Sequence, residues 1–140
     1  MHDIEKITGI IKDIENYERE LKEIGIKSLK ELEKSEKKHA SSMICFAVLN
    51  RVIDLGQEIL VSEKYPMPSR YGDIFINLAK AGVMNLEEAK KINELIDFRN
   101  VIAHTYFELS NKQLFKIIEN IDLINKFIEK IKKKVKKWEK

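Results

Sequence analysis

Apolar side chains recur along most of this chain every three, four or seven residues, the spacing that places them on one face of an α-helix. The first such segment covers residues 4–24, and Gly25 directly after it is suited to end a helix. The segment is therefore expected to form an amphipathic helix of about 20 residues. Its apolar stripe consists of Ile4, Ile7, Ile11, Ile14, Leu21 and Ile24.

A second helix is expected to begin after Ser28, which can cap it with Glu31 three residues later, as in a capping box. Pro66 and Pro68 interrupt the chain further on, because proline cannot donate to a helix ladder. The apolar stripe between these signals contains Leu32, Met43, Ile44, Ala47, Val48, Val52, Leu55 and Ile59.

Two further helices are expected in the middle of the chain. Residues 71–80 are typical of a short helix, and Gly82 ends it. Asn85 can cap the next helix, with Glu88 at its third position. The apolar face of that helix contains Ile92, Leu95, Ile96, Ile102 and Ala103.

The last expected helix is capped by Ser110, with Gln113 as the third residue of the capping box, and runs to the C-terminal end. Its apolar face contains Leu114, Ile117, Ile121, Ile124, Ile128, Ile131, Val135 and Trp138. No segment alternates apolar and polar positions, so no strand is predicted. Residues 1–140 are expected to form a single all-α domain, an antiparallel up-and-down bundle of four long helices plus a short one.

Composition adds limits to this picture. The lone cysteine, Cys45, excludes an intramolecular disulfide and a cysteine-based zinc cluster, and its place on an apolar stripe predicts a buried thiol. The longest run without Asp, Glu, Lys or Arg covers residues 39–50, far short of the roughly 20 residues of a membrane-spanning helix. The N-terminal residues show no signal-peptide pattern. We expect a cytoplasmic protein that does not bind a membrane.

Charge is distributed unevenly along the chain. The 26 Lys and Arg residues exceed the 23 Asp and Glu residues by three. Residues 126–140 contain eight Lys and two Glu, a net charge of +6, so the other 125 residues sum to −3. Within this basic end Lys133, Lys134 and Lys137 are candidate contacts for RNA phosphates. The alternative is a solvated helix end, where lysines suit the negative pole of the helix dipole.

One segment of the fourth helix departs from ordinary bundle chemistry, because Arg99, Asn100, His104 and Tyr106 lie within eight residues. On a helix, Asn100 and His104 share one face and Arg99 and Tyr106 share another. Arg99 and His104 are about 140° apart around the axis and roughly 7.5 Å apart along it. One helix therefore does not direct both side chains at one small group, and a two-fold related second chain would supply the missing half more naturally.

These residue types suit cleavage of a phosphodiester. An arginine can hold phosphate oxygens at two points and stabilise the charge of the transition state. A histidine such as His104 can remove a proton from a ribose 2′-hydroxyl or protonate a leaving oxygen, and Asn100 could orient the imidazole or bind phosphate. No acidic cluster with metal-binding spacing accompanies them, so we expect a metal-independent reaction and no cofactor. Spacing alone also allows that Arg99 simply pairs with Asp97 at the protein surface and has no functional role.

The segment RNVIAHTY at residues 99–106 resembles the hallmark of the HEPN superfamily, and within it the HepT-like toxins. That hallmark is Arg, four residues, His, one residue and Tyr, with Asn directly after Arg. A second family pattern, P-x-x-Y-x-x-x-F-x-x-L-x-x-x-G-V, is matched by PSRYGDIFINLAKAGV at residues 68–83. Tyr71 and Asp73 lie in this second segment and are further candidates for lining the site.

The resemblance implies a dimeric helical bundle in which two Arg–His motifs form a composite ribonuclease site near the dimer interface. It also implies the toxin of a toxin–antitoxin pair whose partner is a minimal nucleotidyltransferase antitoxin of the MntA type. That partner can silence the toxin by attaching AMP to the motif tyrosine. Carried over to this chain, Arg99 and His104 are catalytic, Asn100 supports them, Tyr106 is the modified residue, and RNA is the substrate.

A second hypothesis belongs to a different class of function. The chain would then be a non-catalytic scaffold subunit that presents Tyr106 and a nucleotide- or RNA-binding groove to a nucleotidyltransferase. The complete set of Arg99, Asn100 and His104 favours cleavage over this alternative.

The remaining polar and sulfur-containing residues have plainer interpretations. Arg51 and Asp54 are expected at the surface of the second helix, and His39 is expected to be solvated beside a run of Lys and Glu. Met43 is expected to serve core packing or dimer packing.

Overall fold

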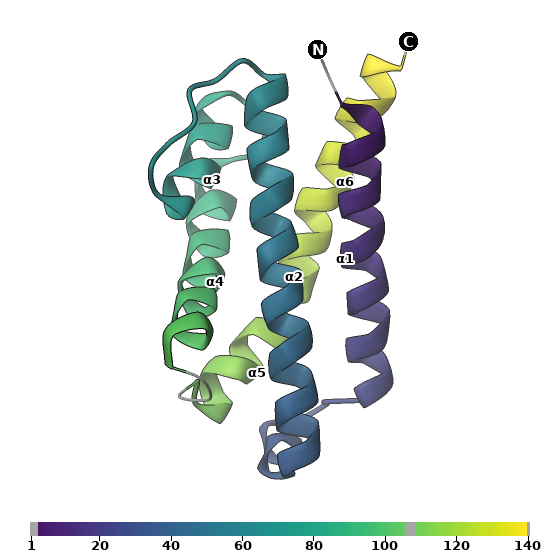
Figure 1. The fold of residues 1–140 in the computed structure, drawn as a ribbon, viewed down its shortest axis with the longest axis vertical. Helices are drawn as coiled ribbons and strands as arrows, with labels where there is room; N and C mark the ends of the chain where they lie inside the picture. Colours follow the sequence, from purple (N-terminus) through teal and green to yellow (C-terminus); the bar gives the residue numbers. More distant parts are fainter. Residues whose placement is uncertain (1–2, 106–108, 140) are drawn as a thin grey trace.

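The computed structural model describes residues 3–105 and 109–139, and for residues 101–105 it describes the backbone alone. Figure 1 shows an all-α bundle, and no strand occurs in the described residues. The elements are α1 (Ile4–Ile24), the 3-10 helix η1 (Leu29–Glu33), α2 (Ser35–Ser62), α3 (Tyr71–Lys80), α4 (Leu86–Thr105), α5 (Asn111–Glu119) and α6 (Ile121–Trp138). The predicted fold class is confirmed.

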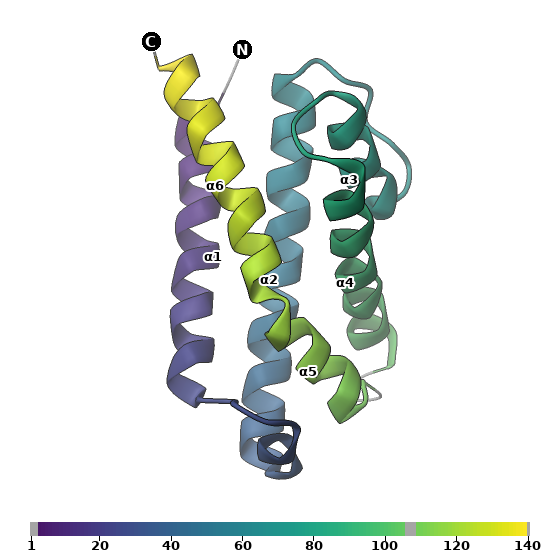
Figure 2. The ribbon, with the colours of Figure 1, turned by 180° about the vertical axis from the view of Figure 1, so that it is seen from behind.

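The long helix α2 forms the centre of the bundle. α1 packs along one side of it, α3 and α4 pack along the other, and α6 crosses behind (Figures 1 and 2). Successive long helices run in opposite directions, so the N-terminal end of α1 and the C-terminal end of α6 lie at the same end of the bundle. The C-terminal end of α4 lies toward the opposite end.

Local capping signals set most of the helix ends as expected. Gly25 has the left-handed conformation (φ 73°) that ends α1. At the start of α4, the amide nitrogen of Glu88 donates to Oδ1 of Asn85 (2.8 Å). At the start of α5, Ser110 and Gln113 form the complete capping box. These bonds satisfy backbone donors that no helix can satisfy from within.

The expected second helix begins later than the capping signal indicated. Ser28 makes no side-chain capping bond, and the residues after it form η1 and not the first turns of an α-helix. Lys34 is extended (ψ 115°), and α2 starts only at Ser35. η1 packs against α2 and α5, which buries Leu32 completely. Burial of this apolar side chain therefore favours the bent path over one continuous helix.

The expected fifth helix is divided into α5 and α6 at Asn120. The backbone of Asn120 leaves the helical region (φ −103°, ψ 15°), and its side-chain amide donates to the carbonyl of Lys116 (2.7 Å). An asparagine side chain competes in this way with the helix ladder. The break gives the two helices different directions: α5 packs against α2 and η1, while α6 crosses the bundle to α1 (Figure 2).

Close packing fixes α3 against the centre of the bundle. The ring of Phe75 meets that of Phe127 edge to face, with 5.8 Å between their centroids. Gly56 of α2 faces α3, and a Cβ at that position would lie 2.8 Å from Cγ2 of Ile74. The glycine therefore permits α2 and α3 to approach closely, which sets the position of Tyr71 at the start of α3.

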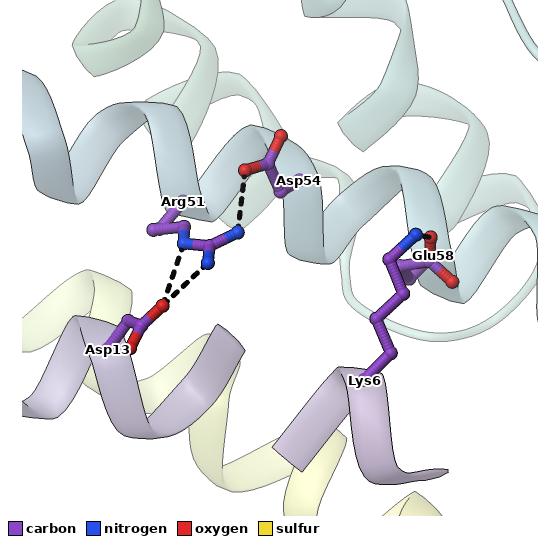
Figure 3. Close-up of polar contacts among 5 residues, drawn as sticks. All are labelled: Lys6, Asp13, Arg51, Asp54 and Glu58. Carbon is purple, nitrogen blue, oxygen red and sulfur yellow. Dashed lines mark hydrogen bonds and ion pairs between the residues drawn. The ribbon is translucent and has the colours of Figure 1, made fainter. Parts of the chain in front are cut away.

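A strip of ion pairs joins α1 to α2 (Figure 3). Arg51 contacts Asp13 of α1 through Nη2 (2.6 Å) and Asp54 of its own helix through Nη1 (3.1 Å). Lys6, near the start of α1, pairs with Glu58, near the end of α2 (2.6 Å). Arg51 and Asp54 thus lie at the surface, as expected, and they also tie two helices together.

Cys45 and Met43, two sulfur-containing residues of α2, differ in their exposure. Cys45 is buried as expected, and burial raises the pKa of its thiol to about 12. Met43 is 72% exposed. Its expected place in the core is therefore wrong for the single chain, and the other expectation for it, dimer packing, stays a prediction. In the described part of the chain, no helix is both long and apolar enough to cross a bilayer.

Candidate functional site

The guanidinium of Arg99 joins α4 to α2. Its Nε donates to the side-chain oxygen of Asn50 (2.7 Å), and its Nη1 donates to the side-chain oxygen of its neighbour Asn100 (3.3 Å). Asn50 lies in the middle of the long helix α2, so the rigid centre of the bundle fixes this bond. Arg99 is partly buried, which restricts its side chain further.

Two aromatic rings complete the surroundings of Arg99. Its central carbon Cζ lies 5.6 Å from the ring centroid of Phe46 and 5.4 Å from that of Tyr71. Phe46 and Asn50 are four residues apart on α2 and share one face, while Tyr71 opens α3. Three helices therefore hold one guanidinium by amide and ring contacts, and a cation over an aromatic face is stabilised electrostatically.

Arg99 of α4 and Arg51 of α2 differ in the charge of their partners. The described partners of Arg99 are two neutral amides and two rings, and within the described residues it forms no ion pair with Asp97. Arg51 instead contacts two carboxylates. The positive charge of Arg99 is thus held in place without being neutralised by these partners. Such a group is suited to bind an anion.

The helix α4 extends through Thr105, so Arg99 and His104 lie on one continuous helix. Their separation of five residues places them about 140° apart around its axis. The backbone of His104 is described but its side chain is not, and Tyr106 lies outside the described residues. The helical placement on which the angular argument depends is confirmed, and the roles of His104 and Tyr106 remain predictions.

A pocket of about 580 Å³ opens between the start of α3 and one face of α4, next to two residues that contact Arg99. Asn100 lines this pocket and also accepts the bond from Arg99. Tyr71 and Asp73, the two candidates from the second sequence pattern, line it as well. The structure therefore brings Arg99, Asn100, Tyr71 and Asp73 into one neighbourhood.

A family model described as ribonuclease HepT-like matches residues 7–131. The chain belongs to this family. The match spans nearly the whole described bundle and includes both sequence patterns that carried the resemblance. A comparison with curated proteins finds no match.

Solved structures share the fold of this HepT-like chain. A toxin–antitoxin structure with AMP-PNP superposes with a TM-score of 0.82 and 16% identity, over 94% of this chain and 98% of the other. The tri-AMPylated HEPN toxin of Shewanella oneidensis in complex with MNT antitoxin gives 0.82 and 18%, over 94% and 98%. YutE, a cytosolic protein of unknown function from Bacillus subtilis, gives 0.82 and 18%, over 98% and 94%. At such identities the likeness shows the fold.

The candidate lysines of the HepT-like chain lie on α6, away from Arg99. Lys134 pairs with Glu63 (2.8 Å), one residue past the end of α2, whereas Arg99 bonds to Asn50 of that helix. Thirteen residues of helix separate Asn50 from Glu63, about 20 Å along the axis. Lys133 and Lys137 are exposed. The basic end and the Arg99 pocket are therefore distinct surfaces.

Asn50 and Phe46 were missed as site residues by reasoning from the sequence. One signal could have found Asn50: it is the polar residue that ends the longest uncharged run of the chain, residues 39–50. An amide at the boundary of such a run needs a hydrogen-bonding partner once it is partly buried. Nothing in the sequence indicates that this partner is Arg99, which is 49 positions away.

Proposed function

We propose that this HepT-like chain is a metal-independent endoribonuclease and the toxin of a toxin–antitoxin pair. Membership of the family supports the ribonuclease activity. Solved relatives of the same fold are a toxin–antitoxin complex with AMP-PNP and a tri-AMPylated HEPN toxin bound to MNT antitoxin, which supports the pairing with a nucleotidyltransferase antitoxin.

The observation that carries the proposal is the position of Arg99. Its guanidinium is fixed by Asn50 and by Asn100, which lines a pocket, and these partners leave its charge available to a phosphodiester. A donor that is already in place when negative charge develops on the phosphate oxygens lowers the barrier most effectively.

In the proposed reaction His104 removes the proton of a ribose 2′-hydroxyl, and the 2′-oxygen then attacks the adjacent phosphorus. The bond from phosphorus to the 5′-oxygen breaks, which leaves a 2′,3′-cyclic phosphate, and the 5′-oxygen takes the proton from the protonated imidazole of His104 to leave as a hydroxyl. Arg99 stabilises the two phosphate oxygens that carry the extra charge, and Asn100 holds Arg99. No metal ion takes part in these steps.

A second copy of the chain completes the proposed site. Arg99 and His104 diverge around α4, so each phosphate would meet Arg99 of one protomer and His104 of the other. The surface beside Arg99 is suited to such a contact, because Met43 is 72% exposed on α2 one helical turn before Phe46. Met43 lies on the same face of α2 as Phe46 and Asn50, so this apolar side chain is available for burial against a partner surface.

The antitoxin would silence this site through Tyr106. The tyrosine hydroxyl attacks the α-phosphorus of ATP, AMP is attached and pyrophosphate leaves. The added phosphate is negative and lies two residues from His104, so it repels RNA and competes for the arginine.

The decisive experiment compares His104→Ala and Arg99→Ala with Arg51→Ala in an RNA cleavage assay, with and without EDTA. The first two substitutions should each lower cleavage at least a hundredfold while the dimer survives in light scattering. Arg51→Ala removes another partly buried arginine, one that is already paired with two carboxylates. It should leave the cleavage rate within about twofold of that of the unsubstituted chain. EDTA should have no effect.

Full cleavage or full toxicity of the His104→Ala chain would refute the catalytic assignment. Co-expression with a neighbouring nucleotidyltransferase gene, followed by intact mass measurement, tests the partner. Addition of AMP at Tyr106 to a chain that cleaves no RNA would instead identify the scaffold subunit.

A further inference from the structure

The pocket beside Arg99 has the size and position of a binding site for one nucleotide. Its floor on α4 is formed by Asn93, Ile96, Asp97 and Asn100, which are spaced three, four and seven residues apart and therefore share one face. Its opposite wall is the start of α3 with the two residues before it. The volume of about 580 Å³ falls within the range of roughly 300–1,000 Å³ that is typical of small-ligand sites.

Two residues connect this pocket directly to the arginine. Asn100 lines the pocket and accepts from Nη1 of Arg99 (3.3 Å). Tyr71 lines it too, and its ring centroid lies 5.4 Å from Cζ of Arg99. A ligand in the pocket is therefore an immediate neighbour of any phosphate bound by Arg99.

The amide of Asn93 indicates that the pocket is built to bind a polar ligand. Its Oδ1 is buried and accepts no hydrogen bond from the described part of the chain. The amide lies beside Gly72, where an added Cβ would be 3.7 Å from Cγ of Asn93. A buried amide oxygen without a partner is costly, and native proteins satisfy such groups. The oxygen is covered in the observed orientation, so a ligand that donates a hydrogen bond would satisfy it after a small rotation of the amide, whose residue lines the pocket.

Charges of both signs surround the pocket, and the two arginines near it outnumber the carboxylate on their side. Arg70 and Asp73 line it at the start of α3, whose first backbone amides also favour negative charge. Arg99 does not line the pocket itself but is bonded to the lining residue Asn100. Asp97 and Asn93 line it on α4. Phosphate thus suits the arginine side, and a base edge that carries N–H donors suits the side of Asp97 and Asn93.

We propose that this pocket binds the nucleotide of the RNA substrate next to the scissile phosphate and selects its base. This inference deepens the proposed ribonuclease function and depends on it for the identity of the ligand as RNA. A carboxylate accepts hydrogen bonds and donates none, so Asp97 favours a base with an exocyclic amino group. Adenine, cytosine and guanine carry such a group, whereas uracil offers only its single ring N3–H, so the selection against uracil depends on contact at the position of the amino group. Asp97 is therefore the specificity-determining residue that selects against uridine, whereas Asn93 contributes to the binding of every base.

The test measures binding of AMP, CMP, GMP and UMP to the His104→Ala dimer by titration calorimetry, so that no cleavage is needed. UMP should bind about tenfold more weakly than the other three, the discrimination expected of one well-formed contact to a base edge. Adding Asp97→Ala should reduce this preference to less than about twofold. Adding Asn93→Leu should weaken all four nucleotides together.

Glu94→Ala is the matched control, because it removes the same charge from the adjacent exposed face of α4. Glu94 does not line the pocket, and its contact with Lys116 (3.4 Å) is exposed. The control should keep the tenfold preference. Because Asp97 is also exposed, its substitution should leave the thermal midpoint unchanged within about two degrees.

Equal affinity for the four nucleotides, a preference that survives Asp97→Ala, or a preference for AMP alone would each overturn the inference. Its failure is distinguishable from that of the proposed function. Cleavage of RNA by the unsubstituted chain without any base preference refutes the pocket alone. A base preference that depends on Asp97 in a chain without cleavage supports the pocket and refutes the ribonuclease.

Discussion

Arg99 and Asn50 are 49 positions apart in the sequence, and the 2.7 Å bond from Nε of the arginine to the amide oxygen of the asparagine joins α4 to α2. A side chain as long as arginine loses substantial rotational freedom when it is held in one orientation. Asn50 and the rings of Phe46 and Tyr71 impose that orientation before any substrate binds. The bond therefore makes Asn50 a positioning residue for the arginine that we propose to be catalytic.

Replacing Asn50 by Ala should lower kcat for RNA cleavage at least tenfold with little change in KM, because a guanidinium that is free to move stabilises the transition state less well. Steady-state kinetics with a fluorogenic RNA measure this change. The control is Asn16→Ala, which removes a similar Arg–Asn bond (3.1 Å) at the exposed surface of α1. Equal losses of kcat in the two variants would mean that Asn50 acts only through stability.

The close approach of α2 and α3 gives a prediction for two glycines. Gly56→Ala should destabilise the protein by about 1–3 kcal/mol, because the new Cβ would lie 2.8 Å from a methyl group of the buried Ile74. Gly9→Ala should stabilise it by up to about 1 kcal/mol, since Gly9 lies inside α1 with no atom within 4 Å of the added carbon. Urea unfolding of the two variants measures both effects.

The Gly56→Ala variant should also cleave RNA more slowly, because α3 must move and carries Tyr71 away from Arg99. Unchanged stability of the Gly56→Ala variant would show that α3 accommodates the methyl group without cost, contrary to this view of the packing.

Glu18 predicts a pH dependence of stability. Burial is the main cause that raises the pKa of Glu18 from 4.5 to about 7, with the nearby charges of Glu15 and Asp122 adding to it. Between these two values the folded state binds more protons than the unfolded state, so stability falls as pH rises through that window. Glu18→Gln should therefore raise the free energy of unfolding at pH 8 by about 1 kcal/mol, a figure reduced for partial exposure, and change it little at pH 4.5.

Urea unfolding at several pH values between 4.5 and 8.5 measures this difference. Glu20→Gln is the control, because it removes the same charge from an exposed position of the same helix. A gain that is the same at all pH values, or an equal pH-dependent gain in the control, would contradict the assignment to Glu18.

The basic end of α6 predicts a change in the salt dependence of RNA binding. Lys133 and Lys137 are exposed, whereas Lys134 is paired with Glu63 and Lys132 with Glu15 (2.8 Å each). If Lys133 and Lys137 contact phosphates, replacing both by Gln should lower the slope of log affinity against log salt by about 1.4 for single-stranded RNA. Lys134→Gln should change this slope less than either exposed lysine, because its charge is already neutralised by a carboxylate.

Fluorescence anisotropy with a labelled RNA and the His104→Ala background gives this slope without cleavage. Lys27→Gln with Lys30→Gln is the control pair, since both lysines are exposed at the far end of the bundle, beyond α1. A slope that is unchanged by the α6 substitutions, or lowered equally by the control pair, would identify this lysine run as a solvated helix end.

The sequence by itself determined the features that arise within one helical turn. Capping bonds span three residues, so Asn85 with Glu88 and Ser110 with Gln113 could be found by inspection. The left-handed Gly25 and the burial of Cys45 were also predictable, because each follows from a residue type at a place in a periodic pattern. The motif with Arg99 and Asn100 was visible because its clustered polar residues interrupt that pattern.

Only the tertiary structure decided which distant residues meet. Local signals near Ser28 and Asn120 did not show that η1 would form or that α5 and α6 would separate, because packing of whole helices outweighs a single cap. The same holds for the bond between Asn50 and Arg99 and for the exposure of Met43. Helical periodicity specifies which face of each helix is apolar, but it does not specify which neighbour that face meets or how far along the axis. The placement of Arg99 and its pocket depends on those two quantities, and the packed bundle alone sets them.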